Sequence, residues 1–240
     1  MLKIRGQEIN KETLAKKIDG SLLNPYTTLQ EISDLVDDCI SYKMNSCCVN
    51  PNYVKYVAGR LKGTVVKTCA VIDYPFGTGT TEDKVSQAKE AINNGAEILD
   101  FVIDYGHLKS GDKGYLLNQI KECVKAADGR ETRFIIEVGY LTDEEVVTAC
   151  KAVIEGGGDF VKSSTGRFDG PEMRVVDLMV KSVAGSKVKI KIAGTGRFWT
   201  SAIALNCLAA GADIIGTRSA KKIIDELPLF ESIVKNFSVE

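Results

Sequence analysis

Eight short runs of β-branched and apolar residues recur along the chain, separated by stretches with helical periodicity. The runs are KKIDGSLL (16–23), SCCVN (46–50), VVKTCAVI (65–72), EILDFVID (97–104), RFIIEVG (133–139), DFVKSS (159–164), VKIKIAG (188–194) and DIIGT (213–217). Because the connections between them are long enough to hold a helix, successive strands are expected to pair in parallel. Eight strand–helix units in 240 residues predict a closed (β/α)8 TIM barrel, with an open doubly wound sheet as the alternative.

Two of the intervening stretches carry the start and stop signals of helices. TEDKVSQAKEAINNG (81–95) and LTDEEVVTACKAVIEGG (141–157) combine a threonine cap signal, early acidic residues, apolar residues at helical spacing and a terminal glycine. Residues 3–16 are expected to form an extra N-terminal helix before the first strand. No linker, low-complexity tract or charge block divides the chain, so residues 1–240 are expected to form a single barrel domain.

The charge balance excludes general attraction to polyanions. The chain has 31 lysine and arginine residues against 32 aspartate and glutamate residues, so we expect no binding to nucleic acid or to an anionic membrane surface. Any anion site must therefore be local. No apolar run approaches the roughly 18 residues of a membrane span, and the first residues lack the apolar core of a signal peptide. A cytoplasmic location is expected.

The cysteines do not form a recognisable framework. Seven are scattered along the chain without a CxxC pair, so we expect no disulfides and assign most of them to the core as small apolar residues. His107 is the only histidine, and no cysteine cluster has the spacing of metal ligands. We therefore expect no metal site, and metal-dependent chemistry would have to rely on carboxylates.

Alternation along the strands predicts which polar side chains point into the barrel. The neighbours of Asp100 in EILDFVID form an apolar set suited to packing under the helices, which leaves Asp100 facing the axis. By the same alternation, Lys162 and Lys191 project inward near the C-terminal ends of their strands. Active sites of such barrels lie at that rim, so we expect these three residues to meet there.

Two interpretations of this meeting are open. In the structural one, Lys162 and Lys191 form ion pairs with Asp100 and Glu137 and stabilise the core. In the functional one, Lys162 sits beside a second cation, Lys191, which favours loss of its proton, and the free amine attacks a carbonyl to form a Schiff base. Asp100 would then shuttle protons directly or through water. Asp19 would support that relay or orient a hydroxyl, and otherwise serves as a cap or ion-pair residue.

The loops after the lysine strands predict an anion site. Glycines let backbone amides approach an anion, and the loops after the last strands of a barrel often hold a phosphate. Arg167 and Arg218 would add bidentate hydrogen bonds to that phosphate. Helices are expected to follow from GPEM (170–173), with Pro171 in the first turn, and from about Phe198. The expected substrate and phosphate residues are Ser164, Thr165, Gly166, Arg167, Gly194, Thr195, Gly196, Arg218 and Ser219.

Nucleotide motifs are absent from the sequence. GTGRFW (194–199) resembles the start of a dinucleotide fingerprint, but Trp199 replaces the third glycine needed for close helix packing, and no N-terminal βαβ nucleotide half accompanies it. GTGTTE (77–82) fails for the same reason. There is no P-loop lysine motif and no GxSxG.

DFVKSSTG (159–166) resembles the Schiff-base segment of the deoxyribose-phosphate aldolase family. Further matching stretches in the same order are CCVNPNYV (47–54), TTEDKVSQAKEAINNGAEILDFVID (80–104), IIEVGYLTDEEVVTACKAVIEGGGDFVKSSTG (135–166) and AGADIIGT (210–217). The resemblance covers most of the chain, from about Ile18 to Ile224. It implies a class I aldolase on a (β/α)8 barrel that cleaves 2-deoxy-D-ribose 5-phosphate to D-glyceraldehyde 3-phosphate and acetaldehyde without a metal or other cofactor.

The resemblance also assigns roles to individual residues. It carries the Schiff-base role to Lys162, the role of the assisting cation to Lys191 and the proton relay to Asp100, and Asp19 matches the aspartate of the first strand. Cys48 aligns with a family cysteine near the pocket, where packing is its expected job. The resemblance further implies that the chain binds a sugar phosphate and aldehydes. By comparison with similar proteins, we also expect a homodimer or a higher homo-oligomer.

The sequence departs from the family pattern at several positions, and these departures bear on which substrate the chain accepts. IDGSLLNP (18–25) lacks the histidine and threonine of many relatives, IAGTGRFWT (192–200) is longer than the usual turn, and Arg218 in TRSA stands where a small hydroxyl residue is expected. The end NFSVE (236–240) lacks the tyrosine with which some members assist proton transfer. Either arginines hold the same phosphate, which we favour, or the acceptor aldehyde differs. A non-catalytic sugar-phosphate binder and a phosphosugar isomerase using carboxylates are the further alternatives.

Overall fold

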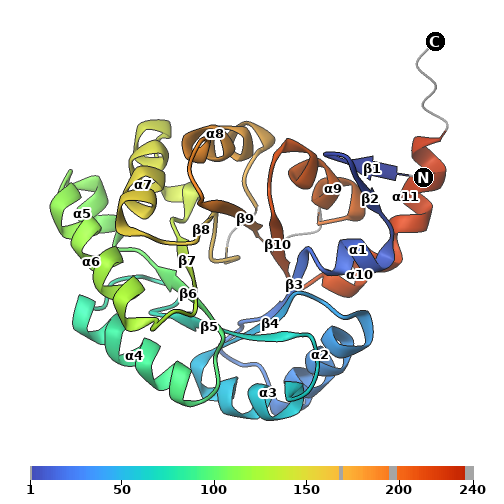
Figure 1. The fold of residues 1–240 in the computed structure, drawn as a ribbon, viewed down its shortest axis with the longest axis horizontal. Coiled ribbons are helices and arrows are strands. Elements are labelled where there is room, and N and C mark those ends of the chain that lie inside the picture. The colour runs from blue at the N-terminus through green and yellow to red at the C-terminus, as the bar shows by residue number, and fades with distance from the viewer. Residues whose placement is uncertain (1, 168–169, 195–198, 236–240) are drawn as a thin grey trace.

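A closed barrel of eight parallel strands forms the centre of the computed structural model, which describes residues 2–167, 170–194 and 199–235 (Figure 1). The strands pair in the order β10-β3-β4-β5-β6-β7-β8-β9. They are β3 (Ile18–Leu22), β4 (Ser46–Val49), β5 (Lys67–Ile72), β6 (Ile98–Val102), β7 (Glu131–Ile135), β8 (Phe160–Lys162), β9 (Lys189–Ala193) and β10 (Ile214–Thr217). The TIM-barrel prediction is therefore confirmed, with each strand falling on one of the eight expected runs.

Helices surround the barrel and cover the outer face of the strands (Figure 1). They are α2 (Leu29–Tyr42), α3 (Val54–Leu61), α4 (Thr81–Asn93), α5 (Tyr105–Lys109), α6 (Lys113–Ala126), α7 (Asp143–Gly156), α8 (Met173–Val183), α9 (Ser201–Ala210), α10 (Ala220–Asp225) and α11 (Leu227–Val234), with 3-10 turns at Pro51–Tyr53 and Val138–Tyr140. The expected threonine signals are real caps. The hydroxyls of Thr80 and Thr142 each accept a hydrogen bond from the amide of the third residue of their helix, and the threonine amides donate to the carboxylate of that same residue, which fixes where α4 and α7 begin.

Two helices begin later than predicted. The α8 helix starts at Met173 with Glu172 as its N-cap, so Pro171 lies before the helix and not in its first turn. The α9 helix starts at Ser201 because the Thr200 side chain accepts from the amide of Ile203. Both βα loops above the lysine strands are therefore longer than the sequence patterns indicated.

The prediction of a helix over residues 3–16 is wrong for most of its length. Residues Leu2–Ile4 (β1) and Gln7–Ile9 (β2) form an antiparallel hairpin, and only Lys11–Ala15 (α1) is helical. Arg5 and Gly6 join the two strands with φ values of 49° and 80°, the left-handed pair that a two-residue hairpin turn requires. The hairpin lies beside α9 at the edge of the barrel (Figure 1).

The predicted alternation of side chains is confirmed. Leu99 and Phe101 of β6 belong to the core between strands and helices, whereas Asp100 lies inside the barrel with all of its side chain buried. The seven cysteines are all buried and free, in agreement with the prediction of core thiols. Among the described residues, the helices include none that is both long and apolar enough to cross a membrane.

Candidate active site

The two predicted lysines and Asp100 meet inside the barrel. Strands β8 and β9 pair in a register that sets Lys162 directly beside Lys191. The Nζ atoms of these lysines lie 2.6 Å and 2.9 Å from the same oxygen, Oδ2 of Asp100. The two nitrogens are thus within a few ångströms of each other, and both side chains are almost fully buried.

Asp19 and Arg133 extend this network toward the bottom of the barrel. Asp19 Oδ2 lies 2.7 Å from Lys191 Nζ and also accepts from Arg133 Nη1, while its Oδ1 accepts from Asn45 at 2.7 Å. Arg133 Nη1 is 3.8 Å from Oδ1 of Asp100. Positive and negative groups therefore alternate through the interior, as buried charges require.

The surrounding charges fix the ionisation of three members of this network. Burial alone would raise the pKa of Asp100, but Lys162, Lys191 and Arg133 outweigh it and hold that pKa well below the usual range. The pKa of Asp19 is likewise held low against its burial, by Arg133 and Lys191. Burial would lower the pKa of Lys191, yet Asp100 and Asp19 raise it above its ordinary value. Lys191 is therefore a permanent cation at neutral pH.

Glu137 binds the loop after Lys162. In the structural interpretation it was a partner of the lysines, but its Oε2 accepts from the amide of Thr165 at 2.9 Å and from the Thr165 hydroxyl. The residue is buried and has a left-handed backbone, with φ of 47°. That conformation costs energy for a residue with a side chain. The carboxylate thus fixes the Lys162 loop and does not neutralise a lysine.

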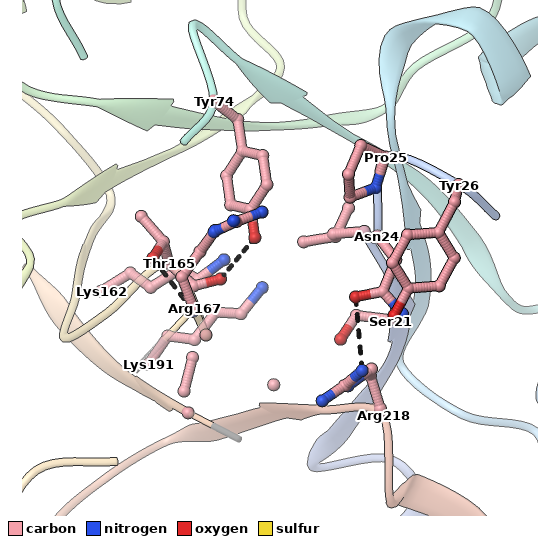
Figure 2. Close-up of a pocket in the computed structure, with 15 residues that line it drawn as sticks. Ser21, Asn24, Pro25, Tyr26, Tyr74, Lys162, Thr165, Arg167, Lys191 and Arg218 are labelled. Carbon is pink, nitrogen blue, oxygen red and sulfur yellow. Dashed lines mark hydrogen bonds between the residues drawn. The ribbon is translucent and has the colours of Figure 1, made fainter. Parts of the chain in front are cut away.

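A cavity of about 300 Å³ opens above the lysines at the C-terminal ends of the strands. Figure 2 shows Lys162, Lys191, Thr165 and Arg167 on one side, and Ser21, Asn24 and Arg218 on the other. Of the predicted residues, the cavity lining includes Lys162, Lys191, Thr165, Gly166, Arg167, Gly194 and Arg218. Among the described residues that line it, none is acidic, so the cavity favours an anionic ligand.

Other predicted residues lie away from this lining. Ser164 is buried and donates to the Ser163 hydroxyl at 3.2 Å, while Ser219 precedes α10 and donates its amide to the Thr217 hydroxyl at 3.0 Å. Asp100 and Asp19 lie deeper in the barrel, and Cys48 Sγ is 4.0 Å from Oδ2 of Asp100. Thr195 and Gly196, and the chain end 236–240, fall outside the described residues.

Some residues of the charge network and of the cavity escaped the sequence analysis. Arg133 has the same parity as Ile135 on β7, so alternation could have placed it inside the barrel. Tyr74 and Asn24 come from loops, where no alternation holds. Tyr74 donates its hydroxyl to the carbonyl of Thr165 at 3.1 Å, and Arg218 Nη1 donates to Asn24 Oδ1 at 3.3 Å (Figure 2). The first contact crosses the mouth of the barrel from the loop after β5 to the loop after β8, and the second joins the loops after the neighbouring strands β10 and β3.

Comparison with known proteins agrees with this geometry. The sequence model of the DeoC/LacD family aldolases matches residues 9–212. The chain is 44% identical over 220 residues to the deoxyribose-phosphate aldolase of Dictyoglomus turgidum, covering 91% of this chain and 99% of the relative. It is 42% identical over 225 residues to the enzyme of the same name from Thermococcus kodakarensis, covering 92% and 99% of the two chains.

A solved structure extends the likeness to three dimensions. The tetrameric deoxyribose phosphate aldolase from Aeropyrum pernix superposes with a TM-score of 0.84 at 29% identity, over 93% of each chain. The family that the sequence motifs suggested is therefore confirmed from both sequence and fold. On this evidence the chain belongs to the DeoC/LacD family of aldolases.

Proposed function

We propose that the chain is a class I aldolase that cleaves 2-deoxy-D-ribose 5-phosphate to D-glyceraldehyde 3-phosphate and acetaldehyde through a Schiff base on Lys162. The observation that carries the proposal is the shared carboxylate oxygen: Asp100 Oδ2 binds both Lys162 and Lys191 at the floor of a cationic cavity. An amine at such a position can meet an aldehyde, and a proton acceptor lies next to it.

The reaction begins with attack of the Lys162 amine on C1 of the open-chain sugar. The carbinolamine loses water to give an iminium ion, which accepts the electron pair when the C2–C3 bond breaks. The C3 hydroxyl gives up its proton, and D-glyceraldehyde 3-phosphate leaves. The remaining enamine takes a proton at C2, and hydrolysis releases acetaldehyde and the free lysine. Asp100 moves these protons directly or through water.

Lys191 assists from a fixed position. Its ammonium is held between Asp100 and Asp19, at 2.9 Å and 2.7 Å, and remains charged at neutral pH. This permanent cation helps to keep the Asp100 carboxylate ionised beside the Lys162 amine, where it can accept a proton. Asp19 and Arg133 keep Lys191 in place, so they act on the reaction by positioning.

The substrate phosphate is assigned to the rim. Arg167 and Arg218 line the cavity and are exposed at its mouth, where their guanidinium groups can reach a phosphate. Gly166 and Gly194, in the loops that follow the two lysine strands, also line the cavity. Ser164 and Ser219 then serve to shape these turns. By analogy with the tetrameric relative, we also infer a homo-oligomer.

A second candidate is the same chemistry on another acceptor aldehyde. It is favoured by Arg218, whose side chain contacts Asn24 and narrows the side of the cavity opposite the lysines. A different anionic tail would then suit the two arginines.

Turnover of 2-deoxy-D-ribose 5-phosphate tests the proposal, with acetaldehyde followed by an NADH-dependent alcohol dehydrogenase. Lys162→Arg is expected to abolish cleavage while binding remains, and Lys189→Arg serves as the matched control on a neighbouring strand.

A panel of phosphorylated, sulfonated and uncharged aldehydes separates the two candidates. Better turnover of a non-phosphorylated substrate favours the second, and binding without turnover points to a sugar-phosphate binding protein. Conversion to a ketose would instead indicate an isomerase.

A further inference from the structure

Two thiols lie next to the active-site carboxylate Asp100. Strands β4 and β5 pair Cys48 with Cys69 in register, and their Sγ atoms are 3.2 Å apart although the residues are separated by 21 positions in the sequence. Cys48 Sγ is also 4.0 Å from Oδ2 of Asp100. One ligand atom from each of Cys48, Cys69 and Asp100 lies within 4.8 Å of the others. The sequence spacing gave no sign of this cluster, because strand pairing creates it.

These three ligands match a borderline-soft divalent cation. Zn²⁺ and Cd²⁺ favour thiolate sulfur with carboxylate oxygen, at distances near 2.3 Å for zinc–sulfur and about 2.1 Å for zinc–oxygen. Tetrahedral ligands at those distances are on the order of 3.5 to 3.8 Å apart. The observed separations of 3.2 Å and 4.0 Å bracket this range, so small side-chain shifts suffice.

The second carboxylate oxygen of Asp100 is only partly engaged. Oδ1 is buried and accepts no hydrogen bond among the described residues, and Arg133 Nη1 lies 3.8 Å from it, beyond hydrogen-bond distance. Nearly all buried polar atoms in folded proteins have a hydrogen-bond partner, so this carboxylate keeps acceptor capacity beyond its two lysine contacts.

Charge and access both permit the ion. Each thiol loses its proton to solvent as the sulfur–metal bond forms, so uptake of one divalent ion with release of two protons leaves the net charge of the interior unchanged. The cluster also lies next to an entrance. Leu23 and Tyr74 pack against it, and both residues line the active-site cavity.

We propose that Cys48, Cys69 and Asp100 form an inhibitory binding site for Zn²⁺ or Cd²⁺ at the active-site carboxylate. A bound ion takes the Asp100 oxygen that Lys162 and Lys191 share, and thereby removes the proton acceptor of the reaction. The inhibition rests on the proposed aldolase function, whereas the binding itself does not.

Titration of the purified chain with Cd²⁺ alone tests the binding. The wild type is expected to bind one ion per chain with the ultraviolet absorption of cadmium–thiolate bonds, and Zn²⁺ is expected to displace it. Cys69→Ala removes one ligand and is expected to weaken binding at least about tenfold, in line with the sensitivity of metal sites to their ligand shells. Cys150→Ala, a buried cysteine of α7 outside the cluster, is the matched control and keeps the wild-type signal.

Turnover in the same titration tests the inhibition. Cd²⁺ should abolish wild-type cleavage, EDTA should restore it, and Cys69→Ala should stay active at the same Cd²⁺ concentration. Cys48→Ala provides a second ligand variant should Cys69→Ala fail to fold. Equal binding by the wild type and both ligand variants overturns the site. Binding that depends on the cysteines in a chain without aldolase activity keeps the site and refutes the proposed function. Cysteine-dependent binding that leaves turnover unchanged overturns the inhibitory role.

Discussion

At the scale of single residues, the site depends on the charge of Lys191. This lysine contacts both buried carboxylates, and its removal leaves Asp100 Oδ2 with only one of its two ammonium partners. We expect Lys191→Met to lower kcat by about 10² to 10⁴, the usual contribution of positioned proton-transfer groups. Lys189→Met is the control, because Lys189 has the same parity on β9 but is exposed at the opposite end of the strand.

Steady-state kinetics on deoxyribose 5-phosphate check this expectation, with circular dichroism confirming that both variants fold. Equal loss of kcat in the two variants would show that the position of the charge is irrelevant. Unchanged kcat in Lys191→Met would remove Lys191 from the mechanism.

Arg133 is predicted to be the main electrostatic support of the fold. It is fully buried and contacts Asp19, Glu131 and Asp100. Arg133→Met leaves buried carboxylates without their cation, which is expected to cost about 3–5 kcal/mol of the free energy of unfolding. Arg174→Met, in an exposed ion pair with Asp143, is expected to change it little. Urea denaturation of both variants measures the difference, and similar midpoints would contradict the role of Arg133.

Alternation along single strands was enough to predict the meeting of Asp100, Lys162 and Lys191. It could not supply contacts that depend on which strands become neighbours. Cys48 and Cys69 come together only through the register of β4 and β5, and Asn45 reaches Asp19 from a loop. Glu137 was a partner of the lysines only in the structural interpretation, and in the structure it binds Thr165 from a residue with a left-handed backbone. Such contacts follow from closure of the barrel, which no single segment encodes.

At the scale of elements, packing between helices distinguishes two glycines. A Cβ added at Gly156, the last residue of α7, would lie 2.3 Å from Cγ2 of the buried Ile120 in α6. A Cβ added at Gly59 in α3 would meet nothing within 4 Å. We therefore expect Gly156→Ala to destabilise the protein by about 1–3 kcal/mol through overpacking. Gly59→Ala is expected to stabilise it by about 0.5–1 kcal/mol, since alanine favours the helix.

Thermal and urea unfolding of these two variants provide the comparison. The opposite signs are the essential result, because only the Cβ added at Gly156 would meet a neighbouring helix. Stabilisation of both variants would show that α6 and α7 can separate at little cost.

Element types were predicted more reliably than element ends. The long runs and capped helices were recognised because periodicity accumulates over many residues. The N-terminal hairpin was missed because strands of three residues, such as Leu2–Ile4, are too short to show alternation. Its only signal was Arg5-Gly6, a turn that needs two left-handed residues. The sequence predicted that α9 begins at about Phe198, but the Thr200 cap sets its first residue at Ser201.

At the scale of the whole molecule, the buried carboxylates determine the response to acid. The pKa values of Asp19 and Asp100 lie below their ordinary value of 3.8, so their ionised forms stabilise the folded state. That contribution is fully present above about pH 4 and is lost as the pH falls further, because protons then bind the unfolded chain more readily. The pKa of Lys191 is raised, so its charged form also stabilises the folded state. This contribution is lost only as the pH rises into strong alkali.

The difference in unfolding free energy between the wild type and Asp19→Asn measures the stabilisation that the ionised Asp19 carboxylate provides. It is expected to stay constant between about pH 5 and 8 and to shrink toward pH 3, since the wild-type carboxylate then becomes protonated on unfolding. A difference that remained constant down to pH 3 would show that Asp19 is not held ionised by Arg133 and Lys191.

Covalent trapping tests the central claim most directly. The chain is incubated with acetaldehyde, reduced with borohydride, digested and analysed by peptide mass spectrometry. Our account predicts a single two-carbon (ethyl) addition on Lys162 within the peptide that carries DFVKSSTGR (159–167), and none in Lys162→Arg. A modification on another lysine, or no modification at all, would contradict it.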